Sequence, residues 1–581
     1  MAALLVVLVI TLPWSGAAGV LLAGDRRPRA QHAVAVAFSE ASGVASLMLL
    51  SFASTDPAIA IPAGGVFGAF TFVPDGLGIF LAVIATVVGS LAVIFSVDYM
   101  RGEAQLGRYY FLVLLFIGAM CGLALTGSLL LLFIFWEMTA LCSYALISFH
   151  NDDPKAVAGG IKALVITQIG GIGLLIGVLV AYAQFGSYDI GNLLANAGSL
   201  SPAAVSFIAF GFLLAAAAKS AQVPFHTWLP GAMEAPTPVS ALIHAATMVN
   251  AGVYLLARFY PAFASVPGWT DAVMVIGILS ALLGALMALV ATDLKRVLAY
   301  STISQLGYMV YAIGVGGIFA SQLHLMSHAV FKALLFLGAG AVIHTIGTRD
   351  LRRMGGLGGS MPFVRSVFVV GALALAGLPF ANGFWSKELI LESGLEAAPW
   401  SFWAMLIGAG LTALYTFRVV WLVFFGQRRV AYPVHDAPAA MRVALGVLAF
   451  GTLTTWLLAG PFGDLLRATL PFHQLHVEST LELIGAVLAA PVTWVALLVI
   501  ALGLAAWWWR SRLVAFSTRL QFVARAASAD FGFEWLNCHV VIVAESTANW
   551  LRGTQTGQLN WNMVGIVGAL VVVLLVLVIG R

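Results

Sequence analysis

Apolar stretches follow one another along almost the whole chain, with only short polar segments between them. Stretches of roughly 18–25 apolar residues are long enough to cross a bilayer as helices, and counting them predicts about sixteen transmembrane helices. The first stretch, from Met1, lacks the basic start of a secretory signal, so we expect it to be a span. The pattern predicts an all-α, polytopic membrane protein with short loops.

Proline interrupts two of the predicted helices. Pro224 breaks one and Pro379 the other, and each break has a lysine nearby, Lys219 and Lys387. A proline inside a helix leaves backbone carbonyls without their hydrogen bonds. In a membrane this is tolerated only where other protein groups or water donate hydrogen bonds to those carbonyls. Paired broken helices are typical of transporters built from inverted repeats, so we predict two inverted five-helix repeats with discontinuous helices. The alternative is that proline is simply common in membrane helices.

The character of the chain changes after Arg510. Residues 512–552 mix charged side chains with periodic apolar ones, which is typical of an amphipathic helix that lies along a surface. The predicted divisions are N-terminal transmembrane helices at 1–108, five-helix repeats at 109–262 and 269–427, additional helices at 428–510, an amphipathic lateral helix at 511–552 and a C-terminal transmembrane anchor at 553–581.

The composition excludes a soluble protein of this length, because 61% of the residues are hydrophobic and 9% are charged. The net charge of +4 comes from loops with clustered arginines, such as Arg26 and Arg27 or Arg352 and Arg353. Such clusters anchor cytoplasmic loops of membrane proteins and do not form a nucleic-acid surface. We therefore expect a multi-pass protein of the cell inner (cytoplasmic) membrane.

No cofactor or metal site is expected on this chain. The three cysteines, Cys121, Cys142 and Cys538, are far apart and offer no disulfide framework, metal clip or iron–sulfur ligand set. The sequence also lacks a glycine-rich phosphate-binding loop between a strand and a helix. Any redox step would belong to partner subunits.

One acid and one base lie inside apolar runs, Glu137 and Lys219. A charge near the bilayer centre costs roughly 2.5–3.5 kcal/mol on insertion scales, so these residues are expected to face a partner or water. Two such residues on different helices indicate a proton or ion path. The alternative is a structural buried ion pair.

Histidines and further lysines extend this series. His324, His328 and Lys332 are spaced four apart, which places them on one face of a helix. A metal site and coincidence are the competing interpretations; a metal is disfavoured because no carboxylate or cysteine accompanies the histidines locally. His244 follows the first break and can carry protons near neutral pH, although a lone histidine is more often a packed residue. Lys387, beside Glu388, ends the series.

Several long motifs resemble one known family, the antiporter-like subunits of respiratory complex I, Mrp cation/proton antiporters and membrane-bound hydrogenases. The resemblance covers roughly residues 75–430, and its motifs include Phe135-Trp-Glu-Met-Thr139, Ala218-Lys-Ser-Ala-Gln-Val-Pro-Phe-His226, Ala235-Pro-Thr-Pro238, Asp293-Leu-Lys-Arg296 and Ser327-His-Ala-Val-Phe-Lys332. It implies a core of about fourteen helices with two inverted repeats. It also implies a proton channel in which Glu137 pairs with Lys219, and the proton is carried onward by His244, His324, His328, Lys332 and Lys387.

Within this family the chain is intermediate between the L-type subunit of complex I and the A-type subunit of Mrp. L-type subunits usually carry charged residues where this chain has Gln168 and Gly171. A-type subunits often have a lysine at the position of Asn250 and continue well past residue 581. The sequence alone therefore does not identify the complex to which the chain belongs.

The favoured function is a proton-translocating subunit of a multisubunit complex, with another cation such as sodium as the alternative ion. The expected partners are other membrane subunits, which form a quinone-reductase-like translocase or an antiporter. The runner-up is a membrane subunit that energises inorganic-carbon uptake with a large soluble zinc-containing partner. A scaffold with an inactive channel is a third possibility, and retention of Glu137, Lys219 and Lys387 argues against it.

Overall fold

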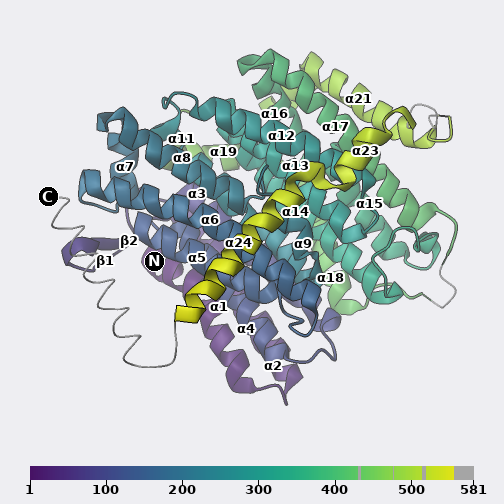
Figure 1. Cartoon of the computed structure of the whole chain (residues 1–581), viewed down its shortest axis with the longest axis horizontal. Coiled ribbons are helices and arrows are strands. Elements are labelled where there is room, and N and C mark those ends of the chain that lie inside the picture. The colour runs from purple at the N-terminus through teal and green to yellow at the C-terminus, as the bar shows by residue number, and fades with distance from the viewer. Residues whose placement is uncertain (430–433, 476, 513–517, 555–581) are drawn as a thin grey trace.

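Long apolar helices pack side by side to form most of the molecule (Figure 1). The structure is a computed structural model, which describes residues 1–429, 434–475, 477–512 and 518–554. Within these ranges, thirteen helices are long and apolar enough to cross a membrane. The predicted all-α, polytopic membrane architecture is thereby confirmed. The predicted last span, near residue 571, lies outside the described residues.

The first six helices precede the functional residues or carry the first of them. They are α1 (Ala2–Ala23), α2 (Pro28–Leu49), α3 (Gly76–Tyr99), α4 (Leu106–Leu125), α5 (Leu129–Ile147) and α6 (Pro154–Phe185). A β-hairpin, which the hydrophobic pattern did not predict, joins α2 to α3. Its strands β1 (Ile59–Pro62) and β2 (Ala69–Phe72) are antiparallel, and Ile59 pairs with Phe72.

The middle of the chain holds the first broken helix and the most buried segments. Its helices are α7 (Ile190–Asn196), α8 (Pro202–Lys219), α9 (Trp228–Gly231), α10 (Thr237–Ala241), α11 (Met248–Phe263), α12 (Trp269–Val290), α13 (Leu294–Gly314) and α14 (Ile318–Ile346). A π-helical turn, η5 (Leu242–Ala246), joins α10 to α11. Although α13 is too polar to count among the thirteen spans, it is buried between α12 and α14.

The remaining helices include the second break and the surface segment. They are α15 (Pro362–Ala376), α16 (Asn382–Ala397), α17 (Pro399–Val420), α18 (Ala439–Thr454), α19 (Ala459–Thr469), α20 (Thr480–Ala489), α21 (Pro491–Trp508), α23 (Gln521–Ser528) and α24 (Phe533–Thr554). The helix breaks predicted at Pro224 and Pro379 are present, because α8 stops at Lys219 and α15 stops at Ala376. The inverted symmetry of the repeats and the boundaries of the predicted divisions stay predictions.

The predicted lateral segment crosses the outside of the bundle as two helices, α23 and α24 (Figure 1, yellow). A short 3₁₀ turn at Asp530–Gly532 separates them, and Phe531 there has a positive φ of 51°. Large apolar side chains such as Trp535 and Val543 remain more than half exposed on α24. Residues 521–554 of this segment are therefore helical and superficial, but they do not form one continuous helix.

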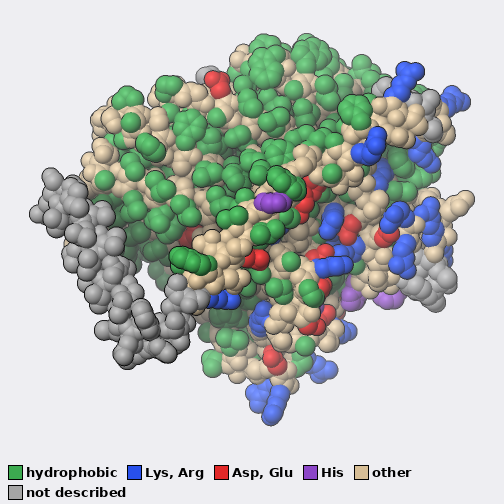
Figure 2. All heavy atoms as spheres, viewed as in Figure 1, with side chains coloured by type: hydrophobic (Ala, Val, Ile, Leu, Met, Phe, Trp, Pro, Cys, Tyr) green, Lys and Arg blue, Asp and Glu red, His purple; other side chains and the backbone are tan. Residues whose placement is uncertain are grey.

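Charged loops gather on one face of the bundle, which we call the basic face and define by Arg26, Arg101, Arg296, Arg352 and Arg429. Loop contacts join these helix ends: Asp25 accepts a hydrogen bond from the amide of Gly107, and Asp98 accepts one from the amide of Ala440. Figure 2 shows Lys and Arg side chains gathered toward α2, α15, α18 and α23. The surface over α12, α16 and α17 is largely apolar (Figure 2).

Candidate proton path

Lys219 is the last residue of α8 and lies at the first helix break. Its side chain is fully buried, and its ammonium donates a hydrogen bond of 2.6 Å to the carbonyl of Trp136 on α5. The same ammonium lies 4.6 Å from the centre of the Trp136 ring. The C-terminal end of a helix carries a partial negative charge, which stabilises a cation at this position. The break therefore provides a site for a buried positive charge.

Glu137 follows Trp136 on α5 and is partly buried. Its carboxylate accepts a hydrogen bond from the amide of Gln168 on α6. Gly171, one turn further along α6, leaves room for the carboxylate, because a Cβ at that position would collide with it. Both side chains are within the described residues, and no ion pair of 4.0 Å or less joins Glu137 to Lys219.

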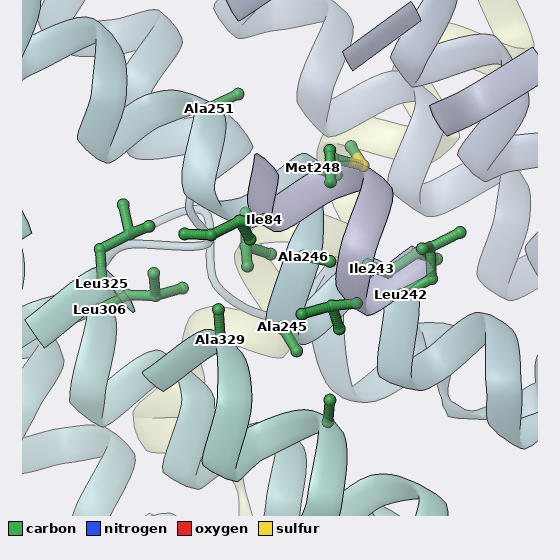
Figure 3. Packing of buried hydrophobic residues seen from close by; sticks show 14 of the residues in the cluster. Ile84, Leu242, Ile243, Ala245, Ala246, Met248, Ala251, Leu306, Leu325 and Ala329 are labelled. Carbon is green, nitrogen blue, oxygen red and sulfur yellow. The ribbon is translucent and has the colours of Figure 1, made fainter. Parts of the chain in front are cut away.

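His244 lies in the π-helical turn η5, and its side chain is fully buried. Its ring packs against Phe336 at 4.6 Å between centroids, and among the described residues neither ring nitrogen has a hydrogen-bond partner. Figure 3 shows apolar side chains packed near this turn, among them Ile84 of α3 and Ala329 of α14. Buried polar atoms are normally paired, so a fully buried imidazole with both nitrogens unpaired is unusual.

The stripe predicted from the four-residue spacing on α14 is present, and all three side chains are fully buried. His324 contacts Gln305 on α13 at 3.1 Å and Ser386 on α16 at 2.9 Å. The ring centroids of His324 and His328 are 6.4 Å apart. His324 therefore connects three helices through polar side chains inside the bundle.

Lys332 lies at the other end of this stripe and faces α13. Its ammonium donates hydrogen bonds to the hydroxyl of Ser301 and, at 3.2 Å, to the carbonyl of Leu298. Electrostatic interactions connect Lys332 to His328, His244 and Lys387. His328 itself has no hydrogen-bond partner on either ring nitrogen among the described residues.

Lys387 on α16 repeats the arrangement of Lys219 at the second break. Its ammonium donates a hydrogen bond of 2.9 Å to the carbonyl of Leu375, in the last turn of α15, and lies 5.7 Å from the Tyr308 ring. Lys387 and its neighbour Glu388 are 1% and 3% exposed. Unlike the ammonium of Lys219, which binds the middle of α5, this ammonium itself meets the negative end of an interrupted helix.

The structure places five of the seven predicted residues in one buried group, on η5, α14 and α16. Lys332, His328 and His324 lie in a row on α14, and His324 contacts Ser386, the neighbour of Lys387 on α16. His244 interacts electrostatically with Lys332, while Lys219 is buried separately, bound to the Trp136 carbonyl of α5. Glu137 lies outside this buried group and is partly buried against α6, where Gln168 binds its carboxylate.

Sequence reasoning missed several polar residues that belong to the same interior. Lys295 is 3% exposed and donates a hydrogen bond of 2.6 Å to the carbonyl of Ala235, yet its place at a helix start resembles a loop anchor. Gln305 and Ser386 are buried partners of His324. The four-residue spacing of Ser301 and Gln305 on α13 was the available signal. Within the described part of the chain, no group of three or more His, Cys, Asp or Glu could hold a metal ion.

Two family models match the sequence. One, described as NADH:quinone oxidoreductase/Mrp antiporter, TM, matches residues 126–412. The other, described as NADH-Ubiquinone oxidoreductase (complex I), chain 5 N-terminus, matches residues 61–110. The first range contains all seven predicted proton-carrying residues.

Individual relatives come from both branches of this family. The chain is 39% identical over 522 residues to NADH-quinone oxidoreductase subunit L of Mycobacterium tuberculosis, covering 86% of this chain and 81% of the relative. It is 44% identical to NAD(P)H-quinone oxidoreductase chain 5 of Synechocystis sp., covering 62% of this chain and 55% of the relative. It is 38% identical to Na(+)/H(+) antiporter subunit A1 of Staphylococcus haemolyticus, covering 64% and 51%. The matches thus span only about half the length of the last two relatives.

Solved structures share the fold. A chain of the Mrp complex from Dietzia sp. DQ12-45-1b matches 99% of this chain with a TM-score of 0.82 and 28% identity, and 63% of that chain is covered. A chain of the membrane-bound sulfane sulfur reductase, an archaeal respiratory complex, matches 83% of this chain with a TM-score of 0.72 and 25% identity, and 99% of that chain is covered. By its family models and its alignment to the mycobacterial subunit, this chain belongs to the NADH:quinone oxidoreductase/Mrp antiporter family of membrane subunits.

Proposed function

We propose that this chain is the proton-translocating subunit of a multisubunit complex in the cytoplasmic membrane. In this proposal Glu137, Lys219, His244, His324, His328, Lys332 and Lys387 carry the proton. The observation that supports it most strongly is the row of fully buried ionisable side chains Lys332, His328 and His324 on α14, whose His324 contacts Ser386 beside Lys387. Buried charges of this kind are costly, and in membrane proteins they are characteristic of ion paths.

Protons suit this path better than sodium ions. A lysine ammonium has only donor hydrogens, so it repels a metal cation, whereas it can release a proton and take up another. Histidine likewise exchanges protons near neutral pH. Three lysines and three histidines line the proposed path, and Glu137 is its one carboxylate.

Lys219 and Lys387 each bind a backbone carbonyl of another helix. When charged, Lys219 is held by the carbonyl of Trp136 and Lys387 by that of Leu375. Lys332 and Lys387 interact electrostatically, and two buried ammonium groups repel each other in a medium of low polarity. Charging one of them therefore favours release of the proton from the other.

The partner that drives transfer is either a redox module or a second transported cation. The mycobacterial and cyanobacterial relatives are named as subunits of quinone oxidoreductases, which contain a redox module. The staphylococcal relative is named as a subunit of a Na(+)/H(+) antiporter. No observation favours the inorganic-carbon alternative. We therefore expect copurification with membrane subunits of a quinone-reductase-like or an Mrp-like complex.

The test uses the tagged chain expressed with its native partners. Membrane vesicles with Lys219→Ala or Lys332→Ala should lose most proton transport, by about tenfold or more, because each variant removes a proton carrier. Lys155→Ala, an exposed change at the start of α6, is the matched control and should transport normally. Wild-type rates in both path variants would contradict the proposal. Mass spectrometry of the copurified subunits identifies the complex.

A further inference from the structure

Beyond Lys387, α16 carries three carboxylates that the proposed path does not use: Glu388, Glu392 and Glu396. They are spaced four residues apart, so they lie on one face of the helix. Successive carboxylates are separated by about 6 Å along the helix axis. α13 starts on the basic face at Leu294, and α16 runs toward the opposite face, where the turn between α13 and α14 lies.

The burial of these carboxylates decreases in the same order. Glu388 is 3% exposed, Glu392 is partly buried and Glu396 is exposed. Oε2 of Glu388 is buried, and among the described residues it has no hydrogen-bond partner. The row therefore connects the fully buried neighbourhood of Lys387 with the surface.

A cavity of about 560 Å³ lies at the outer end of the row. Glu392 and Glu396 line it from α16, Glu478 from the segment before α20, and Gly316 and Gly317 from the turn between α13 and α14. None of its described lining residues carries a positive charge. A space of this size and polarity holds on the order of ten water molecules.

This arrangement has no evident role in stability. Glu392 interacts electrostatically with Glu396 and Glu478, and like charges repel one another. Unlike Asp75, which is paired with Arg258, none of the three forms an ion pair within the described part of the chain. Carboxylates gathered around water raise the local concentration of protons.

We propose that Glu388, Glu392 and Glu396 conduct protons between Lys387 and the water on the face opposite the basic face, with Glu478 at the mouth. This inference rests on the proposed proton path and extends it by naming its outer end. The Lys387 ammonium gives its proton to the Glu388 carboxylate, which leaves a neutral amine and a carboxylic acid. Glu388 then passes the proton to the Glu392 carboxylate, directly or through a bridging water, and becomes a carboxylate again. Glu392 releases it to the cavity water.

Neutral substitutions test the row. Glu392→Gln keeps the size of the side chain and removes its proton-carrying ability, so it should lower proton transport in vesicles by about tenfold. Glu396→Gln should lower it less, because water at this exposed position can replace the carboxylate. The matched control is Asp271→Asn, an exposed change at the start of α12 on the same face.

Accessibility gives a readout that does not depend on turnover. In a Cys538→Ser background, which leaves only the buried Cys121 and Cys142, Glu392→Cys should react with a charged, membrane-impermeant thiol reagent added to the face opposite the basic face. Labelling only from the basic face, or none from either side in a correctly assembled complex, would contradict the inference.

The outcomes separate this inference from the function on which it rests. If Lys387→Ala stops transport while Glu392→Gln and the double variant Glu392→Gln with Glu396→Gln transport normally, the path stands and the proposed outer end is wrong. If Lys387→Ala also transports normally, the proposed function itself fails. Loss of sodium-dependent but not of proton-dependent transport in Glu392→Gln would make the cavity a cation vestibule and overturn the inference.

Discussion

The amide of Gln168 donates a hydrogen bond to the carboxylate of Glu137, while the ammonium of Lys219 is bound one residue away, at the carbonyl of Trp136. Glu137 and Lys219 thus each bind a neutral group, the Gln168 amide and the Trp136 carbonyl, and not each other. We propose that the long Lys219 side chain moves from the Trp136 carbonyl to the Glu137 carboxylate during transport. In our account this exchange is the switch at the start of the path.

Gln168→Leu should weaken this switch, because it removes the donor that positions the Glu137 carboxylate. We expect proton transport to fall severalfold, with the complex still assembled. Thr167→Val is the matched control, since the Thr167 hydroxyl bonds only to carbonyls of its own helix. Proton uptake by vesicles at equal complex content is the measurement. Unchanged transport in Gln168→Leu would remove Gln168 from the account.

The hydrophobic pattern predicted the membrane spans, both helix breaks and the stripe of His324, His328 and Lys332, because each depends on the order and spacing of residues within one segment. It did not predict which groups the buried lysines bind. Lys219 and Lys387 bind backbone carbonyls of other helices, at Trp136 and Leu375, and a backbone acceptor leaves no trace in the sequence.

A buried ion pair between Asp75 and Arg258 joins the start of α3 to α11, and both side chains are less than 10% exposed. Asp75→Asn would leave the guanidinium buried without its counterion, which typically costs about 3–5 kcal/mol. We expect a clear fall in the thermal unfolding temperature of the purified complex. Arg467→Gln breaks an exposed pair with Asp464 and should cost about 0–1 kcal/mol, so its unfolding temperature should hardly change. Equal effects of the two variants would contradict this.

The surface helix α24 is attached at the first helix break. Asn537 is 3% exposed and donates hydrogen bonds of 2.9 Å to the carbonyl of Pro224 and the hydroxyl of Thr227. Asn537→Leu should loosen α24, because two buried acceptors lose their donor, and limited proteolysis of the complex should cleave the tail faster. Glu545→Gln, an exposed change on the same helix, is the control. Equal cleavage rates would show that α24 is held elsewhere.

A second contact, the ion pair between Glu534 on α24 and Lys162 on α6, should make the attachment of α24 weaker at acid pH. Burial alone would raise the pKa of Glu534, but the hydrogen bond and charge of Lys162 outweigh it and hold the pKa below its usual 4.5. A lowered pKa stabilises the folded state above the usual pKa, and this stabilisation is lost as the pH falls through the lowered value. Proteolysis of the tail should therefore accelerate below about pH 4.5 in the wild type, relative to its rate at neutral pH. In Glu534→Gln the acid-dependent part of that acceleration should be absent.

The amphipathic helical structure of residues 521–552 could be predicted because the apolar positions recur with a helical period. The break at Asp530–Gly532 was not, since it depends on Phe531 taking a positive φ and on Asp530 accepting a hydrogen bond of 2.6 Å from Tyr300. Lys295 was missed for a similar reason: only the fold reveals that Ala235 covers it.

The most direct test of the account is proton transport by Lys387→Arg. Arginine keeps the positive charge and can reach the Leu375 carbonyl, so the complex should assemble, but its guanidinium does not release a proton at any accessible pH. We predict that Lys387→Arg vesicles lose transport as completely as Lys387→Ala vesicles do, while Lys155→Arg vesicles transport normally. Transport at the wild-type rate in assembled Lys387→Arg complex would contradict the claim that Lys387 carries the proton.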